Sequence, residues 1–183
     1  MKRFITTTIL TLLLCFLPIG ATGQGTTDHV YLPGSSGPGA SGYAGANVVY
    51  FNRVYIDRSV SVNKVAFKIN SGPVGALFSA GLYTDDGNTL LIDSTPIAAT
   101  PGVKTSTLLL TVPISPGYYL QAYTGNASYV VYGAVAIPEN AVFNAVMANT
   151  GQAANGSVNG QLPATLGTLT ASPRGTIVML LSN

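Results

Sequence analysis

The densest group of oxygen-bearing side chains in this sequence lies at residues 85–88, which read Asp-Asp-Gly-Asn. Two carboxylates and an amide in close succession are the hard oxygen ligands that calcium prefers. The side chains of Asp85, Asp86 and Asn88 are therefore a candidate calcium site. Asp-Gly is also among the favoured hairpin turns, and a turn explains the same residues without a metal. Calcium needs six or more oxygens, so other ligands would have to join this group.

Side chains for catalysis are scarce. The only histidine is His29, in a Gly-rich N-terminal stretch, and the only cysteine is Cys15, in an apolar run near the start. A catalytic triad needs a histidine held rigidly beside a nucleophile and a carboxylate, which a loose terminal stretch does not provide. No HExxH, GxSxG or phosphate-binding glycine motif occurs. We therefore expect no catalytic residues, no enzyme activity and no cofactor apart from the calcium considered above.

A second candidate site is a face of tyrosines within residues 117–135, GYYLQAYTGNASYVVYGAV. Two apolar runs flank Gly125-Asn126, which predicts a β-hairpin with a two-residue turn. In such a hairpin, one face carries Tyr119, Gln121, Tyr123 and Tyr132, and this face is the candidate ligand-binding site. Exposed tyrosines could serve as a platform for sugars. The alternative is that they form cross-strand pairs that stabilise the sheet by roughly 0.2–1 kcal/mol each.

Short strands are expected to position both sites. Apolar or alternating runs at 47–56, 60–69, 77–84, 89–97, 103–112 and 175–181 are separated by turn residues. In 60–69, Val65, Phe67 and Ile69 share one face, and 175–181 predicts a central strand buried on both faces. Residues 141–148 fit a strand or a short helix. About eight or nine strands at this spacing predict an all-β fold, an antiparallel, jelly-roll-like β-sandwich.

The chain begins with the pattern of a secretory leader. Lys2 and Arg3 precede an apolar run too short to span a membrane, and small residues follow, which predicts a signal peptide at 1–23. Removing it leaves six of the eight basic residues to balance six acidic ones. No basic face for nucleic acid is expected, nor a membrane span, and the protein is predicted to be secreted or surface-displayed.

Residues 24–46 form a Gly/Ser/Pro-rich N-terminal segment, and residues 47–183 form the predicted sandwich domain. One short strand is expected in that segment, near residues 28–33. This strand could be exchanged with a neighbouring subunit in a homo-oligomer. The alternative is an edge strand that packs on its own domain, since most termini are only loosely held.

Several segments together resemble a β-sandwich domain of bacteriophage tail-fibre and other virion surface proteins. They are VNKVAFKI (62–69), AGLYTDDGNTLL (80–91), SPGYYLQAYT (115–124) and LPATLGTLTASPRGTIVML (162–180). The resemblance covers roughly residues 47–182, implies a non-catalytic structural or receptor-facing module, and carries over no catalytic residues. The leader favours a secreted or surface-displayed relative.

The expected function follows from these observations. The first expectation is a secreted, non-catalytic structural or adhesive module of a cell-surface or extracellular, virion-like fibre, whose partners are other protein subunits or a surface glycan. The alternative is a free secreted carbohydrate-binding protein that uses the face of Tyr119, Gln121, Tyr123 and Tyr132.

Overall fold

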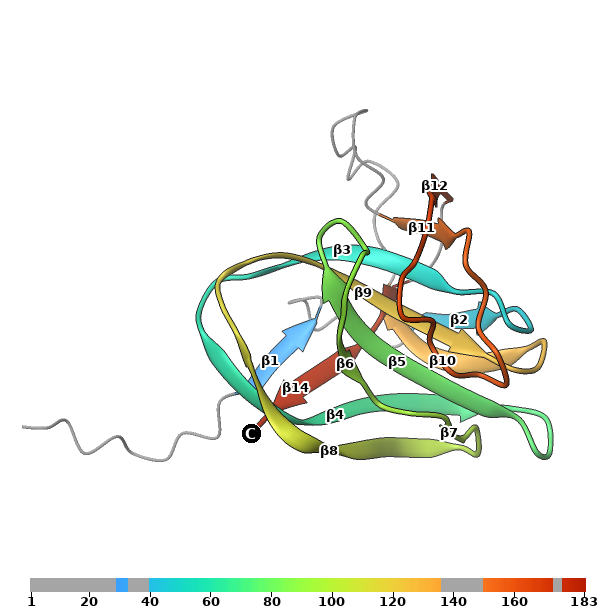
Figure 1. The fold of residues 1–183 in the computed structure, drawn as a ribbon. Coiled ribbons are helices and arrows are strands. Elements are labelled where there is room, and N and C mark those ends of the chain that lie inside the picture. The colour runs from blue at the N-terminus through green and yellow to red at the C-terminus, as the bar shows by residue number, and fades with distance from the viewer. Residues whose placement is uncertain (1–28, 33–39, 136–149, 173–175) are drawn as a thin grey trace, which may run out of the picture.

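The computed structural model describes residues 29–32, 40–135, 150–172 and 176–183, and these residues form two facing β-sheets (Figure 1). Each sheet has seven strands, and all strand pairs are antiparallel. The described residues contain no helix. The predicted all-β sandwich is therefore confirmed. The strands are more numerous than expected because several are only two to four residues long.

The strands divide between the sheets as follows. The first sheet contains β1 (His29–Leu32), β2 (Ala40–Ala44), β4 (Val60–Ser71), β8 (Gly102–Ile114), β10 (Val130–Val135), β13 (Thr176–Ile177) and β14 (Met179–Ser182). The second contains β3 (Tyr50–Ile56), β5 (Leu77–Thr84), β6 (Leu90–Asp93), β7 (Ile97–Ala98), β9 (Gly117–Gly125), β11 (Thr150–Ala153) and β12 (Leu169–Ala171). The chain crosses between the sheets repeatedly, as it does in jelly-roll-like sandwiches.

The first sheet is organised around β4, whose alternation of apolar and polar residues was visible in the sequence. Val65, Phe67 and Ile69 are buried, whereas Lys64 and Lys68 are exposed, as predicted. β8 runs antiparallel along one side of β4, and β14 and β10 pair with its other side. One face of this sheet therefore closes the core and the other faces outward.

The core between the sheets is rich in aromatic side chains. Phe67 and Tyr132 extend from the first sheet, and Phe78 and Tyr123 from the second. Their ring centroids are 4.7–6.2 Å apart in the pairs that contact one another. Aromatic pairs at such spacings add to the stabilisation that burial alone provides. No disulfide is needed to explain this interior.

The second sheet is covered on both faces at its centre. Its inner face contributes to the main core, and a second cluster of buried side chains lies on its outer face, comprising Val49, Phe51, Tyr83, Leu120, Ala122, Leu162 and Leu166. Leu162 and Leu166 come from the connection between β11 and β12, which we call the cover segment (residues 154–168). Leu166 N–H donates to the Gly87 carbonyl at 2.8 Å, which attaches the cover segment to the β5–β6 turn.

The predicted hairpin at residues 117–135 is wrong. β9 pairs with β3 and β5 in the second sheet, whereas β10 pairs with β2, β4 and β13 in the first. Residues 126–129 therefore cross from one sheet to the other instead of making a two-residue turn. The physical reason is that both strands are rich in apolar residues. Each strand can therefore bury its side chains while it pairs with other strands in a different sheet. The hairpin predicted at Asp85–Asn88 is confirmed, since β5 pairs with β6.

Both ends of the described chain belong to the first sheet. β14 lies between β1 and β4, so residues 179–181 of the predicted C-terminal run belong to a central strand. Residues 176–177 of that run form the separate strand β13, which pairs with β10 at the end of the strand order. β1 pairs with β14 of its own chain, and β2 pairs with β10, so the segment 24–46 contributes two strands where one was expected. The predicted signal peptide at 1–23 and the segment 141–148 lie outside the described residues. Among the described residues, no helix is long and apolar enough to cross a membrane.

Candidate functional site

The predicted ligand-binding face of tyrosines points into the core. Tyr123, Tyr132 and Gln121 are fully buried, and only Tyr119 is partly exposed. The expectation that these four side chains form an exposed platform is therefore wrong. Tyr123 and Tyr132 do meet, but they face each other from opposite sheets instead of lying side by side on paired strands. Tyr119 donates its hydroxyl to the Ser115 carbonyl at 2.7 Å.

Gln121 shows why a mixed polar face can be buried. Asn52 Nδ2 donates to Gln121 Oε1 at 2.9 Å, and Gln121 Nε2 donates to the Ile177 carbonyl at 3.0 Å. A buried amide is tolerated when its donors and acceptors find such partners. The sequence contains no signal for these partners, because Asn52, Gln121 and Ile177 belong to three strands far apart in the chain.

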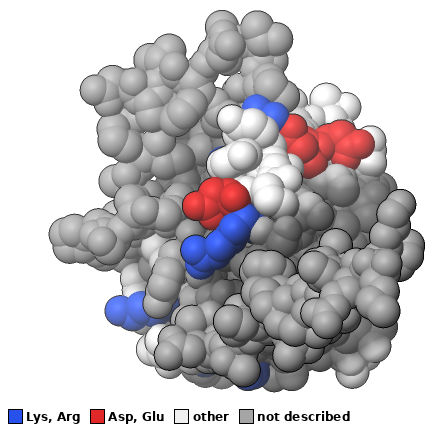
Figure 2. Space-filling view, turned by 90° about the vertical axis from the view of Figure 1, so that its left-hand side faces the viewer, with Lys and Arg blue, Asp and Glu red and all other residues white. Residues whose placement is uncertain are grey.

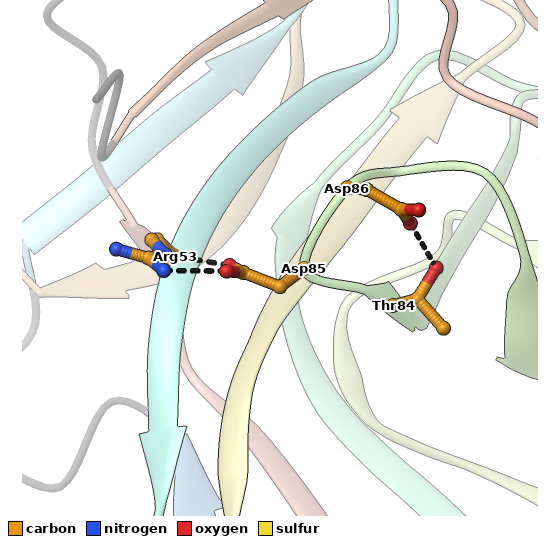
Figure 3. Close-up of polar contacts among 4 residues, drawn as sticks. All are labelled: Arg53, Thr84, Asp85 and Asp86. Carbon is orange, nitrogen blue, oxygen red and sulfur yellow. Dashed lines mark hydrogen bonds and ion pairs between the residues drawn. The ribbon is translucent and has the colours of Figure 1, made fainter. Parts of the chain in front are cut away.

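The candidate calcium ligands do not converge. Asp85 forms a two-pronged ion pair with Arg53 of β3, in which Arg53 Nε donates to Asp85 Oδ1 at 2.5 Å and Nη2 donates to Oδ2 (Figure 3). The Asp86 carboxylate points the other way, toward Thr84 (Figure 3). Among the described residues, no group of three His, Cys, Asp or Glu side chains could hold a metal ion. The structure thus leaves Asp85 and Asp86 with separate roles in the turn.

Asp86 closes the β5–β6 turn. Its Oδ1 accepts from the Thr84 hydroxyl at 2.6 Å and from the Asn88 backbone N–H at 3.0 Å, and its Oδ2 accepts from Asn88 Nδ2 at 2.9 Å. These bonds, the one from Thr84 above all, hold the pKa of the Asp86 carboxyl below its usual range. Gly87 adopts a φ of +72°, which the turn requires and which glycine tolerates without strain. Asn88 is thus a partner of Asp86.

Two other titratable side chains are perturbed by burial and have structural partners. Burial raises the pKa of the Asp93 carboxyl, and the hydrogen bonds from Thr95 N–H and Gln161 Nε2 oppose that rise. Burial also raises the pKa of the Tyr83 hydroxyl, which donates to the Pro163 carbonyl at 2.5 Å. Tyr83 attaches β5 to Pro163, and Asp93 attaches β6 to Gln161. They tie the cover segment to the sheet.

An exposed aromatic group lies on the outer face of the second sheet, opposite to the face of β9 that carries Tyr119, Gln121 and Tyr123. Tyr55 of β3 and Tyr118 of β9 are register partners, and their ring centroids lie 4.9 Å apart at an interplanar angle of 54°. Their exposed fractions are 59% and 53%. The guanidinium carbon of Arg53 lies 4.1 Å from the Tyr118 ring centroid. We call Arg53, Tyr55, Asp85 and Tyr118 the tyrosine patch.

The tyrosine patch is neutral overall, because the charge of Arg53 is matched by that of Asp85. The hydrogen bonds that Arg53 donates to Asp85 are the main reason that the pKa of Arg53 is raised above its usual value. In the space-filling view, basic and acidic side chains adjoin one another on the face shown, with no broad area of one charge among the described residues (Figure 2). The candidate face in the sequence comprised Tyr119, Gln121 and Tyr123, whereas the structure exposes Tyr118 on the opposite face of β9.

A second exposed apolar feature lies on β8. Val62 and Lys64 of β4 pair with Val112 and Thr107 of β8, so residues 108–111 oppose the single residue Asn63. This bulge pushes Leu109 and Leu110 away from the sheet, and they are 102% and 79% exposed. We call these two residues the leucine bulge. The sequence showed a strand here but did not predict the bulge.

The chain was also compared with known proteins. Neither a scan against protein-family models nor a search of curated proteins found a match.

Proposed function

We propose that this chain is a non-catalytic structural or adhesive module of a cell-surface or extracellular fibre, exported by its leader. The observation that carries this proposal is the leucine bulge. Two adjacent leucines that project from a sheet edge favour contact with another protein surface, because burying each is worth roughly 1.5–3 kcal/mol. The resemblance of residues 47–182 to tail-fibre sandwich domains is consistent with such a role.

The mode of contact follows from the rest of β8. β8 pairs with β4, and its other edge has no strand partner among the described residues. Two features oppose direct addition of a further strand. Lys104 lies opposite Phe67, on the core-facing side, and Pro113 has no N–H to donate. The leucine bulge is therefore proposed to insert into an apolar depression on a neighbouring subunit.

A contact of this kind supports a fibre. When a projecting apolar group fits a different surface on the next copy, the contact is head-to-tail and can repeat without closing. A strand-to-strand contact between two identical edges would instead give a closed dimer. The exposed position of Leu109 and Leu110 thus suits the extended assembly.

Analytical ultracentrifugation and negative-stain microscopy test the proposal. The purified protein without residues 1–23 should form larger assemblies as its concentration rises, and a Leu109→Ser/Leu110→Ser variant should remain monomeric. Val74→Ser is the matched control, because Val74 is fully exposed in the loop after β4. A wild-type protein that stays monomeric throughout, or a double variant that assembles like the wild type, contradicts the proposal.

The alternative was a free secreted carbohydrate-binding protein that uses the face of Tyr119, Gln121, Tyr123 and Tyr132. That face no longer supports it, because three of the four side chains are buried. Any sugar-binding role would need a different surface of the molecule.

A further inference from the structure

The tyrosine patch differs from an ordinary cross-strand pair in the way its rings are held. Tyr55 and Tyr118 stand on the two central strands β3 and β9, which are paired over seven residues of each strand. Arg53 covers part of the Tyr118 ring and is itself fixed by Asp85. Rigid aromatic side chains lose little conformational entropy when a ligand binds, so such a surface is prepared for recognition.

The charges of the patch limit the ligand chemistry. The guanidinium of Arg53 is engaged by the Asp85 carboxylate and by the Tyr118 ring. It therefore offers no strong attraction to a phosphate or carboxylate, and Asp85 offers little to a cation. Because the charges of Arg53 and Asp85 offset each other, a ligand without net charge matches the patch best.

The available polar atoms narrow the ligand further. The Asp85 carboxylate is partly exposed and has acceptor capacity beyond its two bonds to Arg53. The phenol hydroxyls of Tyr55 and Tyr118 can donate and accept. The patch thus combines an apolar ring surface with hydroxyl-binding groups along its edge. A pyranose ring has the matching form, with C–H groups on one face and hydroxyls around its rim.

The cover segment leaves this part of the sheet accessible. Its buried side chains pack on Phe51, Leu120 and Ala122, further along β3 and β9, and the described residues place none of them over Tyr55 or Tyr118. Asp85 follows Thr84, which is the register partner of Tyr119, so the carboxylate lies beside Tyr118 at the same end of the sheet. Rings and acceptor are therefore on one continuous surface.

We infer that the tyrosine patch binds neutral hexopyranose units of a glycan, with Tyr55 and Tyr118 as the stacking surface and Asp85 as the hydroxyl acceptor. This site is separate from the leucine bulge on β8, so sugar binding does not depend on assembly. It uses none of the three buried residues of the predicted tyrosine face.

The test uses an array of immobilised neutral hexose and N-acetylhexosamine oligosaccharides, followed by titration with the strongest binder. A Tyr55→Ala/Tyr118→Ala variant should lose at least about tenfold in affinity, as expected when aromatic anchors are removed. Tyr129→Ala is the matched control, because Tyr129 is an exposed tyrosine outside the patch, and it should bind like the wild type. Tyr118→Phe retains the stacking ring and should keep most of the affinity.

Circular dichroism and thermal unfolding establish that each variant is folded before binding is compared. Failure of the wild type to bind any neutral oligosaccharide overturns the inference, as does equal binding by the folded double variant. Binding restricted to sialylated or uronate-bearing glycans, or to proteins alone, overturns it as well. None of these results depends on whether the protein assembles, so they are distinguishable from failure of the fibre proposal.

Discussion

The hydroxyl groups of Tyr123 and Tyr132 lie 2.6 Å apart in the centre of the sandwich, and their ring centroids are separated by 4.7 Å. Tyr123 belongs to β9 in the second sheet, and Tyr132 belongs to β10 in the first. A polar bond thus joins the two sheets inside a largely apolar core. Because the bond is buried, it helps to fix the position of one sheet relative to the other.

Removing either hydroxyl should destabilise the protein measurably. Tyr123→Phe and Tyr132→Phe are each expected to lower the free energy of unfolding by about 1 kcal/mol, through loss of the shared hydrogen bond. The double variant should lose less than the sum, because the second substitution removes a partner that is already gone. Urea unfolding of all four proteins measures the coupling. Tyr129→Phe, at an exposed site, is the control, and strictly additive losses contradict the prediction.

The cover segment should contribute much of the stability of the second sheet. Leu166 is fully buried against the outer face, so Leu166→Ala is expected to cost about 2–5 kcal/mol. Val74→Ala provides the control at an exposed apolar side chain outside the leucine bulge and should change stability by less than about 0.5 kcal/mol. Chemical unfolding monitored by tyrosine fluorescence measures both. Equal effects of the two substitutions would show that the cover segment does not pack as described.

Asp86 should make the protein less stable in acid. Its folded pKa lies below the ordinary value of 3.8, because Thr84 and Asn88 donate to the ionised carboxylate. The stabilisation is therefore present above the unfolded pKa and is lost as the pH falls through the folded pKa. Unfolding free energies measured between about pH 5 and pH 2 should fall more steeply for the wild type than for Asp86→Asn. Parallel curves would contradict this prediction.

Asp93 should change the pH dependence of stability in the opposite direction to Asp86. Burial raises its folded pKa above 3.8, so the protonated form favours folding. That contribution is present below the unfolded pKa and is lost as the pH rises through the raised value. Asp93→Asn should therefore gain stability relative to the wild type as the pH rises from about 4 toward neutrality, in the same unfolding measurements.

Calcium should leave the stability of the protein unchanged. Asp85 is engaged by Arg53, and Asp86 is directed toward Thr84, so the two carboxylates do not share a cation. Calorimetric titration with calcium is expected to give no binding heat, and the midpoint of thermal unfolding should be the same with calcium and with a chelator. A saturable calcium heat that Asp86→Asn abolishes would contradict this prediction.

Local patterns in the sequence determined much of the fold. The alternation of Val65, Phe67 and Ile69 with lysines predicted β4 and its buried face, because one side of that strand is exposed to solvent. The Asp-Gly pair predicted the turn between β5 and β6, since it depends only on neighbouring residues. Abundant short strands with turn residues between them were enough to indicate a sandwich.

Only the tertiary structure decided which face of β9 meets solvent. β3, β5 and β9 are covered on both faces at their centres, so their sequences carry no alternation from which the inner face could be read. Gln121 enters the core because Asn52 and Ile177, distant in the chain, satisfy its amide. Since adjacent residues of a strand point to opposite faces, that choice also placed Tyr118 on the outer surface beside Tyr55.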